Sequence, residues 1–250
     1  MTEISDSGAD SDTDFDFEID RRGSYASKWE KYRGRDVLPF WVADMDFAAP
    51  DFIIDAIQAR LDHRILGYTI TPQPLIEAFV DWLKRSYGWS VSPDWLVWLP
   101  GVVNGLNMAA RACATPGGAI MVPTPVYYPF LSAPGNAEQE GIEVRLIREG
   151  DRWVMDFYAW AEAHRKDTGL FMLCNPQNPT GRCYSEAELT ELAAFCLERN
   201  MVICSDEIHC SLLLDPNARH IPIASLSDEI ANQSITLFAA TKTYNFPGVG

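Results

Sequence analysis

The sequence predicts an α/β protein with a mainly parallel sheet that is covered by helices on both faces. Two observations predict this class: short apolar runs alternate with helix-like segments from about residue 90 onward, and the connections between them are short. Hydrophobic residues make up 47% of the 250 residues, which is ordinary globular composition and excludes wholesale disorder. Parallel strands need a crossover between them, which is usually a helix, so this alternation is typical of a parallel sheet.

The expected elements follow in order along the chain. Two amphipathic helices are expected first, over residues 50–62 and 74–87. The apolar run 95–99 is expected to be the first strand, and a helix over 102–114 follows it. Further strands are expected over 119–122, 142–147, 169–174, 201–204 and 234–239, and further helices over 156–165 and 185–199. Ser185 and Glu188 form a capping-box pattern at the start of the last helix.

The charge is unevenly distributed. The formal net charge is −15, but residues 1–20 contain eight acidic residues and no Lys or Arg. We expect a disordered acidic tail over residues 1–14, with an interaction tail as the alternative. The acidic balance argues against nucleic acid as a partner. No apolar run is long enough for a transmembrane helix, and the first residues lack the pattern of a signal peptide.

The cysteines predict a reducing environment. They contain no C-x-x-C pair, and several lie inside apolar runs: Cys113, Cys174, Cys183, Cys196, Cys204 and Cys210. A domain of this size can build its core without disulfides, so we expect buried thiols in the cytoplasm. The four histidines are scattered, and no zinc site is expected.

Polar residues gather where the expected strands end, which is where ligands bind in open α/β sheets. Gly101 opens a helix whose N-terminus would favour an anion, although a plain turn is the simpler alternative. The segment Asn175-Pro-Gln-Asn-Pro-Thr-Gly181 follows the strand 169–174, and its two prolines restrict the backbone that would hold Asn178.

Carboxylates and a lysine follow the last two expected strands. Asp206 and Glu207 leave the apolar run 201–204, so at least one should be partly buried and need a cation or hydrogen-bond donors. Lys242 follows the strand 234–239 in the same layer. A partly desolvated lysine at this place could form a Schiff base.

Together these motifs resemble a known family. The segments NPQNPTG at 175–181, SDEIH at 205–209 and TKTYNFPG at 241–248 resemble the fold-type I pyridoxal-phosphate enzymes of the aminotransferase class I/II superfamily. Asp20-Arg-Arg-Gly23, Lys28-Trp29 and the block FWVADMDF at 40–47 are similar to the cystathionine β-lyase branch, the C–S lyases of that superfamily. The resemblance covers about residues 15–250 and implies the type I fold of the pyridoxal-phosphate-dependent transferases.

The resemblance implies a role for individual residues. Lys242 is implied to be the Schiff-base lysine and then the general base, and Asp206 the partner of the pyridine nitrogen. Asn178 is implied to bind the phenolic oxygen of the cofactor and Tyr127 to stack on its ring. Further cofactor contacts are implied for the backbone N–H groups of Val102 and Val103, the Thr241 hydroxyl, His209, and Tyr68 at the phosphate of the neighbouring subunit.

Some positions depart from the family pattern. His209 stands where many aminotransferases have a tyrosine and the lyase branch commonly has a histidine, which favours the lyase. Ser211 stands where that branch usually has an aspartate, and Ala239 where relatives often have a phosphate-binding serine.

The resemblance also implies a domain organisation. Residues 15–90 would form an N-terminal arm and helices of a small domain with dimer contacts. Residues 91–250 would form the large cofactor-binding domain, incomplete at its C-terminus. The C-terminal small domain, with the arginine for the substrate carboxylate, is expected to be missing, as in a truncated chain.

The implied function is the α,β-elimination of L-cystathionine or a related cysteine S-conjugate to a thiol, pyruvate and ammonia. The enzyme would be a cytoplasmic homodimer without a metal. A class I/II aminotransferase of an L-amino acid is the first alternative, because the cofactor-contacting residues do not separate the two reactions. A non-catalytic regulatory protein that binds pyridoxal phosphate is the second.

Overall fold

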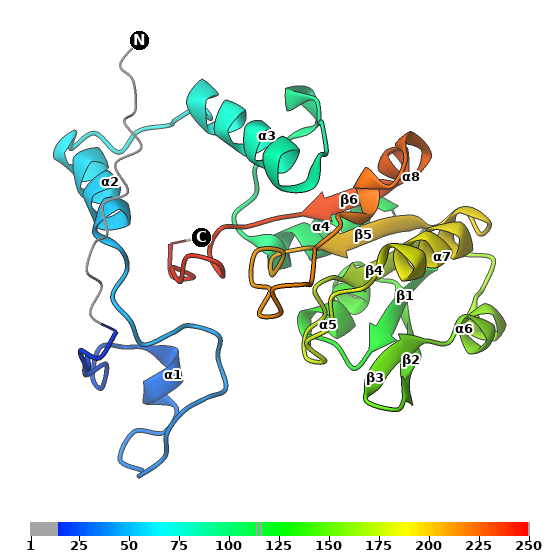
Figure 1. The fold of residues 1–250 in the computed structure, drawn as a ribbon, viewed down its shortest axis with the longest axis horizontal. Helices are drawn as coiled ribbons and strands as arrows, with labels where there is room; N and C mark the ends of the chain where they lie inside the picture. Colours follow the sequence, from blue (N-terminus) through cyan, green and yellow to red (C-terminus); the bar gives the residue numbers. More distant parts are fainter. Residues whose placement is uncertain (1–14, 114, 116, 250) are drawn as a thin grey trace. The chain divides into compact units, whose positions relative to one another are not determined.

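The structure is a computed structural model that describes residues 15–113, 115 and 117–249, so the expected acidic tail lies outside the described residues. The chain divides into two compact units, Met1–Ile70 with Tyr244–Val249, and Thr71–Thr243 (Figure 1). This division falls between residues 70 and 71, whereas the sequence places a boundary near residue 90. The assignment of the first segment to a small domain stays a prediction.

The larger unit, Thr71–Thr243, is built on a six-stranded sheet with the order β3-β2-β1-β4-β5-β6 (Figure 1). All neighbouring pairs are parallel except β2 and β3, which form an antiparallel hairpin. The predicted mainly parallel sheet is therefore confirmed. The strands are β1 (Ala119–Thr124), β2 (Glu140–Glu149), β3 (Arg152–Met155), β4 (Thr168–Cys174), β5 (Val202–Asp206) and β6 (Ser234–Leu237).

The helices α3 (Gln73–Tyr87), η1 (Pro93–Trp95) and α4 (Val102–Cys113) precede β1. The helices that connect the strands are α5 (Pro129–Asn136), α6 (Phe157–Ala163), α7 (Glu186–Leu197), η2 (Ile223–Ser225) and α8 (Asp228–Asn232). The capping box is present at α7, where Glu188 N donates to Ser185 Oγ at 3.4 Å and Ser185 N donates to Glu188 Oε2 at 2.9 Å. The sequence reading missed α5, because Pro134 and Gly135 interrupt its helical pattern.

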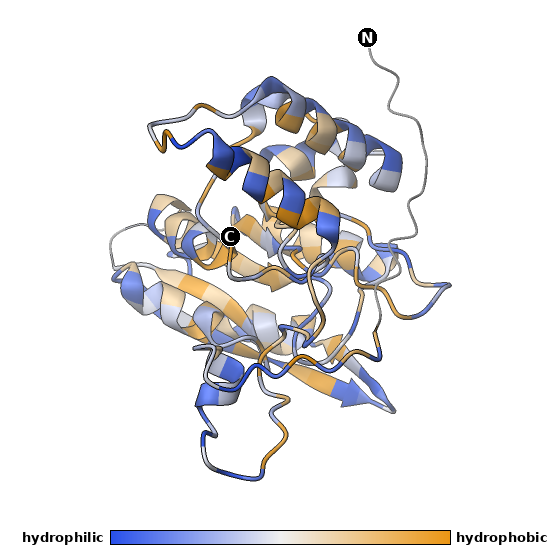
Figure 2. Cartoon of the chain, turned by 90° about the vertical axis from the view of Figure 1, so that its left-hand side faces the viewer, coloured by the Kyte–Doolittle hydropathy of each residue, from blue (hydrophilic) through white to orange (hydrophobic). Residues whose placement is uncertain are grey.

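The sheet carries a separate apolar core on each face. In β4, Phe171 and Leu173 pack against α6 and α7, whereas Leu170, Met172 and Cys174 pack against α4 and α5. Side chains of a strand alternate between the faces, so the continuous apolar runs in the sequence reflect burial on both sides. Figure 2 shows the strands as largely apolar and the helices as mixed in hydropathy.

The expected strand over residues 95–99 is absent, and that prediction was wrong. Residues 93–95 form the short helix η1, and Leu96 N donates to Pro93 O at 3.2 Å instead of to a neighbouring strand. Trp95, Val97 and Trp98 are exposed. Prolines at both ends of this run remove backbone donors from any ladder. The apolar run thus reflects aromatic packing, since the Trp98 ring packs edge-on against the Phe79 ring of α3, with 6.1 Å between the ring centroids.

The smaller unit contains the helices α1 (Ser27–Glu30) and α2 (Asp51–Asp62), the second of which was predicted. An ion-pair cluster organises its first half. Asp46 accepts hydrogen bonds from Arg21 at 2.7 Å, Lys28 at 2.8 Å and the Trp29 indole at 2.9 Å. Burial alone would raise the pKa of the Asp46 carboxyl, but these donors outweigh it and hold the pKa at about 2.

The segment Tyr244–Val249 belongs to the same unit. The Asn245 amide pairs with the backbone of Met45, accepting from its N–H at 2.8 Å and donating to its carbonyl at 3.2 Å. This contact joins residues that are 200 positions apart in the sequence.

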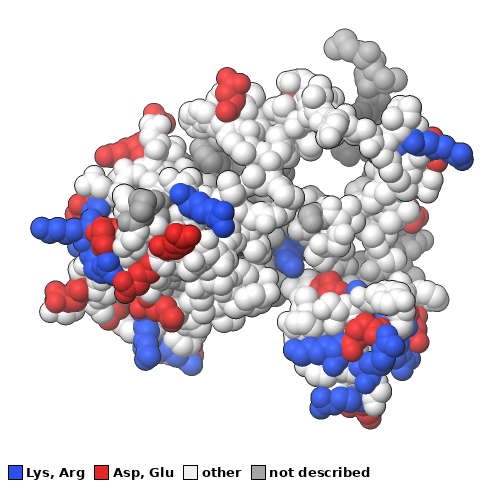
Figure 3. All heavy atoms as spheres, turned by 180° about the vertical axis from the view of Figure 1, so that it is seen from behind, with Lys and Arg blue, Asp and Glu red and all other residues white. Residues whose placement is uncertain are grey.

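The surface charges are mixed in sign. Basic and acidic side chains are interspersed on the face seen in Figure 3. Within the described residues, none of the helices combines the length and the apolar character that crossing a membrane requires.

Candidate active site

The order of the sheet reverses between β1 and β4, and the loops that leave these two strands are tied together. Tyr127 N donates to Asn178 O at 3.1 Å, and Gln177 Nε2 donates to Pro125 O at 2.6 Å. In open α/β sheets the crevice at such a reversal is where ligands bind. The structure therefore places Tyr127 and Asn178 at this reversal of the sheet order, as the positions of their loops predict.

The Asn-Pro loop is a tight turn anchored to β4. Gln177 is buried, and its Oε1 accepts from Thr180 N at 2.8 Å. Asn178 N donates to Cys174 Sγ at 3.4 Å, and Gly181, with φ of +72°, closes the turn by donating to Gln177 O at 2.8 Å. The peptide bonds before Pro125, Pro176 and Pro179 are cis. Three side-chain and backbone contacts thus fix the place from which the Asn178 amide extends.

Asp206 lies at the carboxyl end of β5 and is only 4% exposed. Its Oδ1 accepts from Ile208 N at 3.1 Å. Among the described residues, no cationic side chain forms an ion pair with it. Burial raises the pKa of its carboxyl to about 7; the Ile208 N–H and Lys242 oppose this shift, and Glu207 adds to it. A buried carboxylate that lacks an ion-pair partner favours the binding of a cationic group beside it.

Lys242, His209 and Tyr127 share the electrostatic environment of Asp206. Lys242 is half-buried in the turn after β6 and interacts with both Asp206 and His209. Burial lowers the pKa of His209, and the charge of Lys242 lowers it further. Burial, a hydrogen bond with Tyr128 and the charge of Asp206 raise the pKa of the Tyr127 hydroxyl. The structure therefore brings these four predicted residues together.

The N-terminus of α4 has backbone N–H groups that favour an anion. Val102 and Val103 are its first two residues, and the N–H groups of a first helical turn have no partner within the helix. Gly101 before it has φ of +93°, a conformation that suits glycine. Gly105 lets α4 pack close to β6, because an added Cβ would lie 2.8 Å from Leu237. Thr241 is half-buried beside Lys242 after β6.

A family model described as "Aminotransferase class I and II" matches residues 35–250. The chain belongs to the aminotransferase class I and II family. The family match covers every element of the larger unit and all nine predicted site residues, from Tyr68 to Lys242.

Individual relatives within the family extend this finding. Cystathionine beta-lyase PatB of Bacillus subtilis is 39% identical over 241 residues, which cover 94% of this chain and 62% of PatB. The crystal structure of OvoB is 43% identical with a TM-score of 0.90, covering 94% of this chain and 62% of OvoB. The PLP-bound C-S lyase from Staphylococcus hominis is 35% identical with a TM-score of 0.85, covering 94% and 60%. The predicted resemblance to the C–S lyase branch is confirmed, and the chain spans about three fifths of these relatives.

Among the predicted site residues, Tyr68 is the one that belongs to the smaller unit. Its side chain is fully exposed. Its contact with a cofactor phosphate in a neighbouring subunit stays a prediction, as do the individual roles of the other residues.

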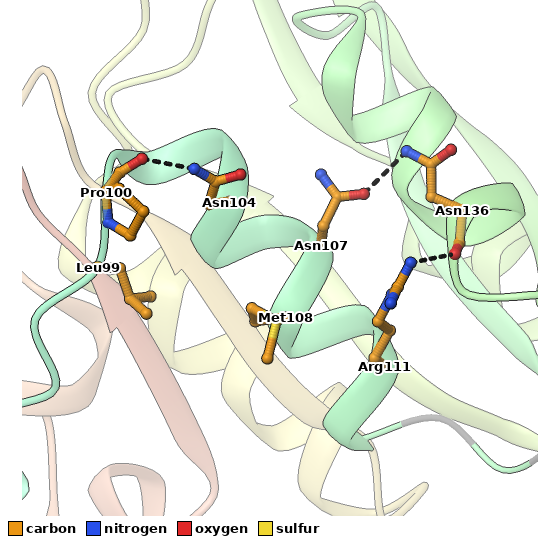
Figure 4. A pocket seen from close by; sticks show the side chains of 7 residues that line it. All are labelled: Leu99, Pro100, Asn104, Asn107, Met108, Arg111 and Asn136. Atoms are coloured by element: carbon orange, nitrogen blue, oxygen red, sulfur yellow. Dashed lines mark hydrogen bonds between the residues drawn. The ribbon is translucent and has the colours of Figure 1, made fainter.

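A cavity of about 560 Å³ lies along α4 on the side away from the sheet, and Figure 4 shows its lining. Asn104 and Arg111 each donate to a backbone carbonyl, of Pro100 and Asn136 respectively, and the Asn136 amide donates to Asn107. None of the predicted site residues lines this cavity.

Sequence reasoning missed His220. Its Nε2 lies 2.7 Å from Glu207 Oε2, and both side chains are buried. The sequence predicted that one of Asp206 and Glu207 would be buried, and the structure buries both. No local pattern relates position 220 to β5, because only the path of the chain after β5 brings the two together.

Proposed function

We propose that the chain is part of a pyridoxal-phosphate-dependent C–S β-lyase that converts L-cystathionine or a related cysteine S-conjugate to a thiol, pyruvate and ammonia. One observation carries this proposal. A buried Asp206 and a half-buried Lys242 interact at the carboxyl end of the sheet, in a chain that is 39% identical to a cystathionine beta-lyase.

The residues at the strand ends fit pyridoxal phosphate. The buried Asp206 carboxyl, which has a pKa of about 7, matches a ring nitrogen that can carry a proton. The N-terminus of α4 matches a phosphate group. The Tyr127 ring, on the loop tied to Asn178, provides a face for an aromatic ring.

The cofactor, when bound, supplies an electron sink for negative charge that develops at Cα of an amino acid. Lys242 Nζ would hold the cofactor covalently and would accept the Cα proton of the substrate as a general base. Asp206 would hold a proton at the ring nitrogen, the Asn178 amide would donate to the ring oxygen, and Tyr127 would stack on the ring. Val102 N, Val103 N and the Thr241 hydroxyl would hold the phosphate.

We also propose that the enzyme is a homodimer in which Tyr68 completes the neighbouring site. The smaller unit exposes large apolar side chains, among them Phe40, Phe52, Leu66, Tyr68 and Ile70. Exposed apolar surface of this kind marks association sites. Mixing a Tyr68→Phe variant with a Lys242→Ala variant would restore activity if the sites are shared, because one site of the mixed dimer would then carry both native residues. All six cysteines are free thiols, which supports a cytoplasmic location.

A product assay tests the proposal. Pyruvate release from L-cystathionine without any added keto acid is expected for the lyase. An aminotransferase would release product only when a keto acid is supplied, and it is the second candidate because the same cofactor residues serve both reactions. Cofactor uptake without turnover of any amino acid would instead indicate a regulatory protein.

A further inference from the structure

Glu207 is a fully buried carboxylate next to Asp206 in the sequence. Side chains alternate at the end of β5, so Ser205 and Glu207 lie on the opposite face from Asp206. Ser205 Oγ donates to Glu207 at 2.8 Å and Ile223 N at 3.2 Å, and His220 Nε2 lies 2.7 Å from its Oε2. Three contacts from two segments of the chain hold this carboxylate in one place.

The His220 ring indicates that the negative charge of Glu207 is not cancelled. Nε2 faces the carboxylate and donates to it, whereas the buried Nδ1 has no hydrogen-bond partner among the described residues. A second ring proton on Nδ1 would be a buried donor without an acceptor, which costs about 1–3 kcal/mol. The Tyr87 ring packs edge-on against His220, with 5.4 Å between centroids. The geometry therefore favours a neutral imidazole that donates one hydrogen bond to an anionic Glu207.

This anion acts on Asp206 from the next position of the chain. The titratable groups that interact electrostatically with Asp206 are Glu207, Lys242, Tyr127, Cys174 and Cys204. Among them Lys242 is the cation, and it lies partly in solvent. Glu207 is 0% exposed, so solvent screens its charge little. Its effect on the Asp206 carboxyl is to raise the pKa, in addition to the effect of burial.

We propose that Glu207 is a positioning residue whose fixed negative charge keeps a proton on the Asp206 carboxyl, ready to be shared with the ring nitrogen of the cofactor. The inference rests on the proposed function for the identity of that ring. No bond to carbon is made or broken, because the proton stays between the Asp206 oxygen and the nitrogen.

The test follows the Asp206 carboxyl directly by NMR. The full chain, labelled with ¹³C at aspartate carboxyls and free of added cofactor, is titrated with pH, and the Asp206 resonance is identified by its loss in Asp206→Asn. Glu207→Gln keeps the shape of the side chain and removes its charge. This variant is expected to lower the titration midpoint of Asp206 by about one pH unit.

A matched control removes the same charge elsewhere. Glu188 is also partly buried and is held by Arg182 and Ser185 at α7. Glu188→Gln is expected to leave the Asp206 midpoint unchanged. An Asp206 titration midpoint that is unchanged or higher in Glu207→Gln would overturn the proposal. If Glu207 had a purely structural role, the variant would lower the stability of the fold but leave the Asp206 titration unchanged.

A second measurement needs no variant of Glu207. With ¹³C at glutamate carboxyls of the native chain, Glu207 must remain ionised over the pH range in which Asp206 titrates. A Glu207 that takes up its proton at a higher pH than Asp206 would contradict the proposal even if Glu207→Gln does not fold.

Cofactor uptake is scored separately, by the visible absorbance of bound pyridoxal phosphate. Failure of uptake would contradict the proposed function, whereas the Asp206 titration would still decide the role of Glu207.

Discussion

The backbone N–H of Tyr127 donates to the carbonyl of Asn178 at 3.1 Å, which joins the loops that leave β1 and β4. These are the strands between which the order of the sheet reverses. The two residues are expected to contact the cofactor, so their relative position depends on this bond and on the Gln177 side chain that braces it.

Replacing Gln177 with alanine should loosen both loops. Its buried amide donates to Pro125 O at 2.6 Å and accepts from Thr180 N at 2.8 Å. We expect a loss of about 1–3 kcal/mol in unfolding free energy, measured by urea denaturation. Weaker binding of pyridoxal phosphate should accompany it. Gln233→Ala is the control, because that amide bonds to Met201 O at the other end of the sheet and should change stability alone.

Lys242→Ala should abolish both the visible absorbance of bound pyridoxal phosphate and the release of pyruvate. The physical reason is that alanine has no amine to hold the cofactor or to accept the Cα proton. Lys166, an exposed lysine after α6, provides the control, and its alanine variant should keep both signals. Full activity in Lys242→Ala would refute the assignment of this residue.

Without bound cofactor, Asp206 should make the fold less stable as the pH rises. Its pKa of about 7 in the folded chain lies above the ordinary value of 3.8. The folded state therefore binds more protons than the unfolded state between these values, and stability is lost as pH rises from about 4 to about 7. Asp206→Asn should flatten this part of the Tm–pH curve. An identical slope in the variant would show that another group is responsible.

His220→Ala should destabilise the larger unit. The change leaves the buried Glu207 carboxylate without its Nε2 donor and opens a cavity beside Tyr87. We expect a loss of at least about 2 kcal/mol, measured by urea denaturation. His63 follows α2 and is exposed, and His63→Ala should cost little. Equal stability of the two variants would argue against a structural role for the Glu207–His220 bond.

The smaller unit should respond to acid through Asp46. Its pKa of about 2 lies below the ordinary value of 3.8, so this group stabilises the fold above pH 4 and the contribution is lost as pH falls toward 2. Fluorescence of Trp29, whose indole donates to Asp46, should change over that range. Asp46→Asn should show the altered signal already at neutral pH. A Trp29 signal that is the same in both proteins at pH 7 would exclude this cluster as an anchor.

Most of the larger unit could be predicted from local patterns. The strands β1, β4 and β5 are apolar runs whose side chains are buried in the cores on the two faces of the sheet. The helix α7 begins with a capping box. The hairpin strand β3 and the helix α5 were missed because they are short or interrupted by Pro134. The segment 95–99 was mistaken for a strand because composition alone does not show whether a backbone partner lies alongside.

The sequence by itself determined the family, the sheet and the motifs after each strand, because these depend on residue type and spacing along the chain. It determined that Asp206, Asn178 and Lys242 stand at strand ends. Only the tertiary structure decided which of these groups share one electrostatic environment, and only it joined Glu207 to His220, thirteen residues away. Burial, charge coupling and hydrogen bonds between distant segments depend on packing in space, which no local pattern encodes.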